Sequence, residues 1–179
     1  MKTISLVLAL LAAPPTLAPE LAHAQAHEHG AARLDVSVEG KTVSLQFEAP
    51  LDALFGFERA PRSAAEKALV DAGIARLKAA DRLFQFDAAA DCRLASVALT
   101  SAALKLGAAA PAAALSAEHA DLEATFEFAC RSATLPGTMD IALFGAFPRL
   151  QRIDIQVATP QGQFKRSLKR PTTRISLRR

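Results

Sequence analysis

Three histidines and an aspartate are the side chains of this sequence best suited to binding a metal ion. His27 and His29 lie two residues apart near the amino terminus, and His119 and Asp121 have the same spacing in the second half of the chain. Neutral imidazole is a strong ligand for zinc and copper, and zinc sites use three or four protein ligands. Side chains two apart in an extended segment point the same way. We therefore expect one metal site from these four residues if the two segments meet, and an amino-terminal tail with idle histidines if they do not.

The amino terminus offers a second kind of metal site, because processing near it would expose a free amine. Small residues suited to cleavage precede both Gln25 and His27, and a cut at either place leaves a histidine as the third residue of the new terminus. The amine, two deprotonated amides and that imidazole form a square-planar set of nitrogens, which suits Cu(II) or Ni(II). Copper or nickel capture by the free terminus is therefore an alternative to zinc.

The first 26 residues have the pattern of a signal peptide. Lys2 is followed by an apolar run from Ile4 to Ala13 that a single serine interrupts. This run and its proline-broken extension are too short to cross a bilayer, which takes about 20 apolar residues. Cleavage after Ala24 or Ala26 would release the remainder of the chain. We predict an exported, periplasmic protein with no stable membrane insertion.

The two cysteines, Cys92 and Cys130, are expected to form a disulfide bond. An even and small number of cysteines in an exported protein favours pairing, because thiols oxidise outside the cytoplasm. Such a bond would close a long loop and stabilise the fold by about 3–4 kcal/mol in the chain-entropy model. A zinc site that uses both thiolates is the alternative.

Other chemistries are poorly represented. Outside the first 29 residues the only histidine is His119, and the chain contains neither a G-x-S-x-G sequence nor a glycine-rich phosphate loop, so we predict that the protein is not an enzyme. The last fifteen residues carry seven Lys or Arg and no acidic residue. Apolar residues punctuate these charges, as in half-buried strands with a solvated face. Because the chain also has no Trp or Tyr to stack on bases, we predict no binding to nucleic acid.

The spacing of apolar residues predicts the elements that must hold these side chains. Residues 34–38 and 43–47 alternate around a Glu-Gly-Lys turn, which predicts a β-hairpin. Ser63 and Glu66 form a capping box at the start of a helix that should end near Arg82. Further strands are expected at 92–100, 122–129, 138–143, 153–157, 164–169 and 174–177, and a low-complexity Ala/Pro-rich loop at 101–117. The sum predicts residues 27–179 as a single α+β domain, an antiparallel β-sheet with one main helix at about 63–82.

Four short motifs resemble those of a known family. They are H-G-x-A-x-L-x-V at 29–36, G-F-E-x-x-P at 56–61, H-x-D…F-x-C at 119–130, and F-G-A-F-P at 144–148 followed by the alternating segment 153–157. Their identities and order resemble a bacterial exported family related to the zinc-regulated periplasmic protein ZrgA. The resemblance covers nearly the whole chain after residue 26.

The resemblance implies a periplasmic accessory protein that binds zinc and assists its uptake, with a zinc ABC-transporter binding protein as the expected partner. Carried over by position, it favours His29 and His119 as functional histidines, with His27 and Asp121 next. Relatives similar to ZrgA carry a long His/Asp/Glu-rich tract before the H-x-D segment, whereas residues 102–117 here are mostly alanine. The resemblance therefore implies a reduced zinc capacity. The alternative from another class is an exported β-rich interaction or structural domain without a metal.

Overall fold

The computed structural model describes residues 29–107, 120–132 and 136–178, and the predicted hairpin lies at the centre of its main sheet. β1 (Ala31–Glu39) and β2 (Thr42–Pro50) pair antiparallel, with Leu34 opposite Phe47. The alternating apolar residues of both strands are buried, whereas most of the polar residues between them are partly or fully exposed. The alternation that predicts the hairpin therefore also decides which face of the sheet is buried.

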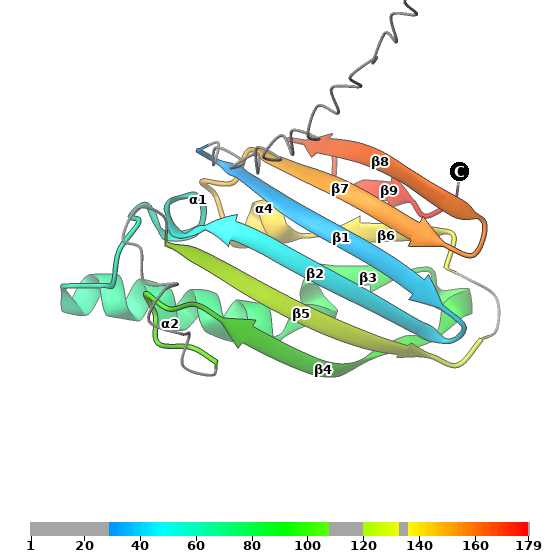
Figure 1. Ribbon diagram of the computed structural model, residues 1–179, viewed down its shortest axis with the longest axis horizontal. Coiled ribbons are helices and arrows are strands. Elements are labelled where there is room, and N and C mark those ends of the chain that lie inside the picture. The colour runs from blue at the N-terminus through cyan, green and yellow to red at the C-terminus, as the bar shows by residue number, and fades with distance from the viewer. Residues whose placement is uncertain (1–28, 108–119, 133–135, 179) are drawn as a thin grey trace, which may run out of the picture.

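Six strands form the main sheet, in the order β4-β5-β2-β1-β7-β8 (Figure 1). The strands added to the hairpin are β4 (Cys92–Thr100), β5 (Asp121–Cys130), β7 (Arg152–Thr159) and β8 (Gly162–Lys169). All neighbouring pairs are antiparallel except β1 and β7, which run parallel. This parallel pair joins the amino-terminal hairpin to the carboxy-terminal hairpin β7–β8, so the sheet is mixed.

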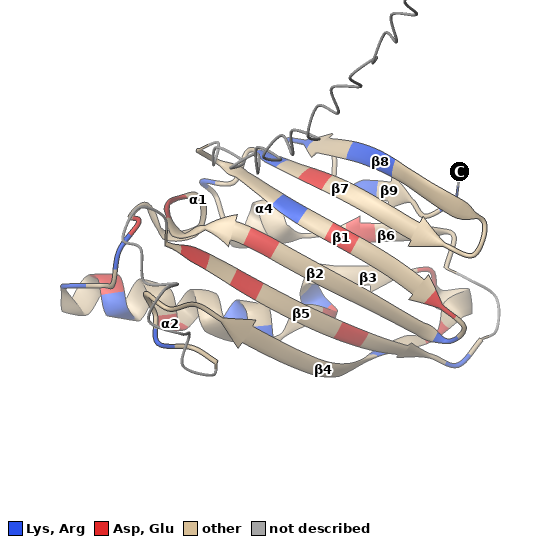
Figure 2. Cartoon of the chain, viewed as in Figure 1, with Lys and Arg blue, Asp and Glu red and all other residues tan. Residues whose placement is uncertain are grey.

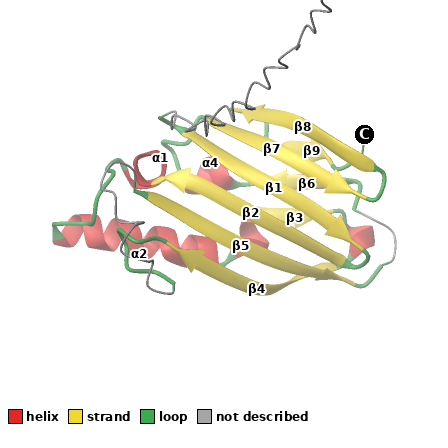
Figure 3. Cartoon of the chain, viewed as in Figure 1, coloured by secondary structure: helices red, strands yellow, loops and turns green. Residues whose placement is uncertain are grey.

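A second layer covers one face of the main sheet (Figures 1 and 3). It contains a three-stranded sheet in the order β3-β6-β9, made of β3 (Phe84–Phe86), β6 (Thr138–Ile141) and β9 (Arg174–Ser176). The helices α2 (Ala64–Lys78), α3 (Ala80–Leu83) and α4 (Leu143–Ala146) lie in this layer too, and a 3₁₀ turn, η1, spans Ala88–Ala90. Buried residues of both layers form one apolar core, which confirms the α+β class. We call the other face of the main sheet its outer face.

The main helix begins where the sequence predicts. The Ser63 side chain accepts from the Glu66 backbone N–H at 3.1 Å, and Glu66 accepts from the Ser63 backbone N–H at 3.3 Å, so the capping box is confirmed. The helix ends earlier than the predicted boundary near Arg82, because Ala79 leaves the helical conformation at φ −92° and ψ 50°. A single turn, α3, follows and leads into β3.

The first part of the segment between β2 and the main helix forms a short helix, α1 (Leu51–Phe55), whose apolar residues are buried. Gly56 ends this helix in the left-handed conformation, at φ +87°. α1 packs against α2, where the Phe55 ring lies directly on Gly73.

The predicted disulfide bond between Cys92 and Cys130 is confirmed. The two cysteines are direct partners across the antiparallel pair β4–β5, so the bond ties the edge strand β4 to its neighbour. None of the helices in the described part of the chain is long and apolar enough to pass through a membrane. Residues 1–28 and 108–119 lie outside the described residues, and with them His27, His119, the expected signal peptide and most of the expected Ala/Pro-rich loop.

Candidate functional site

His29 is the predicted metal ligand that the structure places in a defined environment. It lies in the turn before β1, and its side chain is 79% exposed. Its Nδ1 atom is 3.1 Å from Oδ2 of Asp52 in the first turn of α1. A second carboxylate, that of Glu58, has Oε1 4.0 Å from the same nitrogen. We call His29, Asp52, Glu58 and Arg149, which contacts Asp52, the His29 corner.

Two left-handed glycines shape the turns of the His29 corner. Gly30 has φ +74°, and its carbonyl accepts from the backbone N–H groups of Gln151 and Arg152 at 2.7 and 3.1 Å. These bonds fasten the turn that carries His29 to the strand β7. Gly56, at φ +87°, reverses the chain after α1 and brings Glu58 back towards the same place. Only glycine adopts such angles without strain, so both turns depend on it.

Arg149 closes the His29 corner from the loop between α4 and β7. Its Nε donates to the Asp52 backbone carbonyl at 3.1 Å, and its Nη2 lies 3.5 Å from Asp52 Oδ1. The two carboxylate oxygens of Asp52 therefore face different groups, Oδ1 the guanidinium and Oδ2 the imidazole. An ionised carboxylate only accepts hydrogen bonds, so the neutral imidazole that binds it carries its proton on Nδ1. Nε2 then holds the lone pair that can bind a metal.

Asp121 begins β5, at the same end of the main sheet. It is the Cα partner of Pro50, and the carbonyl of its neighbour Ala120 accepts from the Leu51 backbone N–H at 2.8 Å. The backbone carbonyl of Asp121 also accepts from the Ser101 hydroxyl at 2.7 Å. Because β2 separates β5 from β1, Asp121 is one strand further from His29 than Asp52 is. The structure thus places Asp121 near this end of the sheet, next to the segment that carries Asp52.

The described residues alone do not assemble the predicted four-residue metal site. Within residues 29–107, 120–132 and 136–178, no three His, Cys, Asp or Glu side chains form a group that could hold a metal ion. Two members of the predicted set, His27 and His119, lie outside these ranges. The segment Gln25-Ala26-His27, in which the histidine would be the third residue after cleavage and could bind copper or nickel, also lies outside them. For these residues the sequence-based expectation stays a prediction.

Asp52, Glu58 and Arg149 are the residues of the corner that metal-ligand spacing does not identify. One signal for Asp52 exists in the hairpin, where Arg33 pairs with Glu48 and each step outward shifts both partners by one. Continued for four more residues, this register would bring position 29 opposite position 52, although Asp52 itself lies in α1. Glu58 lies in the G-F-E-x-x-P motif. Arg149 contacts a residue 97 positions away, and no local pattern indicates that contact.

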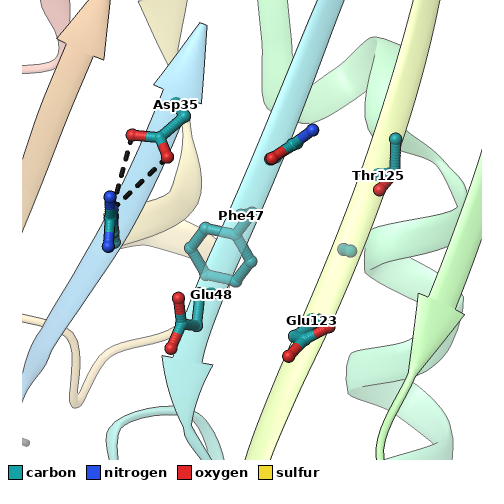
Figure 4. Close-up of a pocket in the computed structure, with 8 residues that line it drawn as sticks. Asp35, Phe47, Glu48, Glu123 and Thr125 are labelled. Carbon is teal, nitrogen blue, oxygen red and sulfur yellow. Dashed lines mark hydrogen bonds and ion pairs between the residues drawn. The ribbon is translucent and has the colours of Figure 1, made fainter. Parts of the chain in front are cut away.

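A depression of about 120 Å³ lies on the outer face of the main sheet, over β1, β2 and β5. Figure 4 shows Glu48 and Glu123 side by side on neighbouring strands, where they are direct Cα partners. Like charges in this arrangement repel each other. Arg33 lies along the same rim and pairs with Asp35 at 3.4 Å. The acidic residues of β2 and β5, visible in Figure 2, therefore make this half of the outer face electronegative.

Comparison with known families agrees with the motifs. The model of a family described as ZrgA family zinc uptake protein matches residues 26–177. The matched range contains His27, His29, His119 and Asp121 as well as the whole His29 corner. No curated protein matches the chain.

Proposed function

The chain belongs to the ZrgA family of zinc uptake proteins, and we propose that it binds a zinc ion in the periplasm and assists its delivery to a zinc-specific ABC transporter. The observation that carries the proposal is the contact between His29 Nδ1 and the Asp52 carboxylate at 3.1 Å. Metal-binding histidines commonly donate their second ring N–H to a carboxylate, which fixes the ring and makes the other nitrogen more basic. His29 shows this arrangement and is exposed to incoming ions.

The remaining ligands are proposed to be His27, His119 and Asp121. Asp121 is the Cα partner of Pro50, and Leu51 donates to the carbonyl of Ala120, the residue that follows His119 in the chain, while His29 contacts Asp52 from the β1 side. Two strand spacings amount to about 9.5 Å, a gap that two imidazoles and an ion can bridge.

The capacity of the proposed site is low. A His/Asp/Glu-rich tract would supply ligands for further ions, whereas residues 102–117 are mostly alanine in this chain. The described residues contain no alternative cluster that would replace the tract. We therefore propose a carrier with one ordered site rather than a storage protein.

Native mass spectrometry of protein processed in the periplasm tests the proposal. The intact mass also gives the mature amino terminus. We expect the wild type to hold a stoichiometric zinc ion, and His29→Ala with His119→Ala to lose it. Because the His29 side chain is 79% exposed, its removal should leave the fold intact. The control is Glu39→Gln, which changes an exposed carboxylate at the far end of the hairpin.

Three results would separate the alternatives. Zinc bound by the wild type but equally by the double variant would place the ion elsewhere in the chain. A strong preference for Cu(II) over Zn(II), abolished by one extra residue ahead of the mature terminus, would favour capture by the free terminus. Absence of any bound metal from the wild type would leave an exported β-rich interaction domain as the function.

A further inference from the structure

Arg149 touches each of the segments that build the His29 corner. Its guanidinium reaches the carbonyl and the carboxylate of Asp52. A Cβ atom added to Gly56 would lie 3.1 Å from both Cζ and Nε of this arginine, so the guanidinium rests on the bare glycine. A Cβ atom added to Gly30 would lie 3.3 Å from the backbone carbonyl oxygen of Arg149. Arg149 therefore packs against the turn that follows His29 and the turn that precedes Glu58.

A second arginine holds the loop that presents Arg149. Arg170 donates to one backbone carbonyl of α4, that of Phe144 at 2.5 Å, and to three of the loop, those of Phe147 at 3.2 Å, Pro148 at 3.0 Å and Leu150 at 2.8 Å. Its Cζ atom also lies over the Phe144 ring, 5.2 Å from the ring centroid. The backbone on both sides of Arg149 is thus fixed, and its side chain starts from a defined position.

The two oxygens of Asp52 are divided between Arg149 and His29. A carboxylate at the start of a short surface helix can rotate about its side-chain bonds, and each rotation changes which oxygen faces the imidazole. Arg149 limits this rotation because its charge attracts Oδ1 while its Nε is bound to the carbonyl of the same residue. Oδ2 is then left facing His29 Nδ1.

We propose that Arg149 is a positioning residue for the metal site, which acts by orienting Asp52 so that neutral His29 keeps its proton on Nδ1 and presents Nε2 to the ion. This inference rests on the proposed zinc-binding function. Neutral histidine in water prefers the opposite tautomer, with the proton on Nε2, in which Nε2 is blocked as a ligand. The Arg149–Asp52 pair therefore prepares the ring before the metal arrives.

The contribution of Arg149 to the fold itself is expected to be small. Its side chain is 57% exposed, and exposed ion pairs add little to stability. Replacing it should leave the protein folded, so a change at His29 can be read as a change in positioning. Arg174→Gln is a matched control, because Arg174 forms a closer pair with Asp140, at 2.6–2.7 Å, in the second sheet.

The test measures the tautomer and the zinc affinity separately. Two-bond ¹H–¹⁵N spectra of the metal-free protein at about pH 8, where imidazole is ordinarily neutral, report which ring nitrogen carries the proton. The His29 signals are assigned by their absence in His29→Asn. The same spectra and a competition titration with zinc are recorded for wild type, Arg149→Gln, Arg149→Lys and Arg174→Gln.

We expect the Nδ1–H tautomer at His29 in the wild type and in Arg174→Gln, and a shift towards Nε2–H in Arg149→Gln. Zinc affinity should fall about three- to tenfold in Arg149→Gln, less than the roughly 10–100-fold that loss of a carboxylate next to a ligand costs. Arg149→Lys should recover part of both changes, since it keeps the charge without the planar fork.

An Nε2–H tautomer in the wild type, or spectra and affinity that do not respond to Arg149→Gln, would overturn the inference while leaving zinc binding in place. The opposite combination, a tautomer that shifts as expected in a protein that binds no zinc, would remove the proposed function and keep the positioning role of Arg149.

Discussion

Asp52 links the imidazole and the guanidinium of the His29 corner through a single carboxylate. If the proposed site is correct, replacing this carboxylate by an amide should weaken zinc binding without unfolding the protein. We expect Asp52→Asn to lower zinc affinity about 10–100-fold, because the ring of His29 loses its charged acceptor. The matched control is Asp154→Asn on the outer face, whose carboxylate binds Arg152 at 3.0 Å and Ser167 at 2.9 Å. Competition titration against a chelator measures both, and equal affinities would exclude a role for Asp52.

Glu66 is a residue through which acid should loosen the start of the main helix. Arg59 donates to both of its oxygens at 2.8 and 3.0 Å, and the Arg62 backbone N–H donates as well, so the pKa of Glu66 falls to about 2. A carboxyl whose pKa is lowered by folding stabilises the protein above its unfolded value, about 4.5, and this contribution is lost as the pH falls towards 2.

The variant Arg59→Gln removes the largest cause of that shift. We expect it to flatten the decline in unfolding free energy between about pH 4.5 and 2, mainly by lowering stability at neutral pH. Arg62→Gln is the control, because it keeps the backbone N–H that binds Glu66. Urea unfolding followed by circular dichroism at several pH values gives the comparison, and parallel curves for Arg59→Gln and wild type would contradict it.

At the scale of elements, the contact between α1 and α2 depends on a missing side chain. A Cβ at Gly73 would lie 2.9 Å from Cζ of Phe55 and closer still to Cε1, and Phe55 is itself buried. Helix propensity favours alanine over glycine by about 1 kcal/mol, yet the clash forces a buried ring to move. We expect Gly73→Ala to destabilise the protein by about 1–3 kcal/mol.

Gly145→Ala provides the comparison for the Gly73 prediction. Gly145 lies in α4, and a Cβ there would meet nothing within 4 Å. Its replacement should therefore be neutral or stabilise by about 0.4–1 kcal/mol through the unfolded state. Guanidinium unfolding measures the free energy of unfolding of both variants. A Gly73→Ala protein more stable than the wild type would show that the Phe55 ring can move aside without cost.

Local patterns predicted most of the elements but not how they combine. Local sequence was sufficient to predict elements that carry a clear period or cap. These are the hairpin β1–β2, the start of α2 with its capping box, and the strand β5. The strand β3 has three residues, too few to show a period, and was not predicted, whereas β6 and β9 were predicted as strands but not as part of a second sheet. The parallel pairing of β1 with β7 depends on strands far apart in the chain.

The residues of the candidate site could likewise be predicted only in part from local sequence patterns. His29 could be chosen from the sequence because imidazole is a distinctive ligand, and the hairpin register could have supplied Asp52. Arg149 could not be foreseen, since its position is set by the loop that Arg170 holds and by the two glycine turns it packs against. Ligands are thus recognisable by residue type, whereas the groups that orient them follow from tertiary packing.

For the molecule as a whole, charge is unevenly distributed over the main sheet. Acidic residues of β2 and β5 lie on one half, and the lysines of β8 lie at the opposite edge (Figure 2). The proposed zinc site is at the end of the acidic half, next to the start of β5. A negative potential there would raise the local concentration of divalent cations at low ionic strength.

The disulfide bond lies at the other end of β5 from the proposed zinc site. Because of this separation, the effect of the bond on stability can be tested separately from zinc binding. Nine residue steps from Asp121 to Cys130 span about 30 Å, since a strand rises about 3.4 Å per residue. The bond between Cys92 and Cys130 closes a loop of 38 residues, so removing it should cost about 3–4 kcal/mol of the 5–15 typical of a domain.

We expect Cys92→Ala with Cys130→Ala to lower the guanidinium midpoint while leaving zinc stoichiometry and affinity unchanged under conditions where the variant is folded. Both cysteines are replaced together, because a single substitution would leave a free thiol that can bind metal on its own. Circular dichroism establishes the folded range, and the chelator competition is then repeated within it. Zinc affinity that falls in this folded variant would make the cysteines ligands and move the site away from His29.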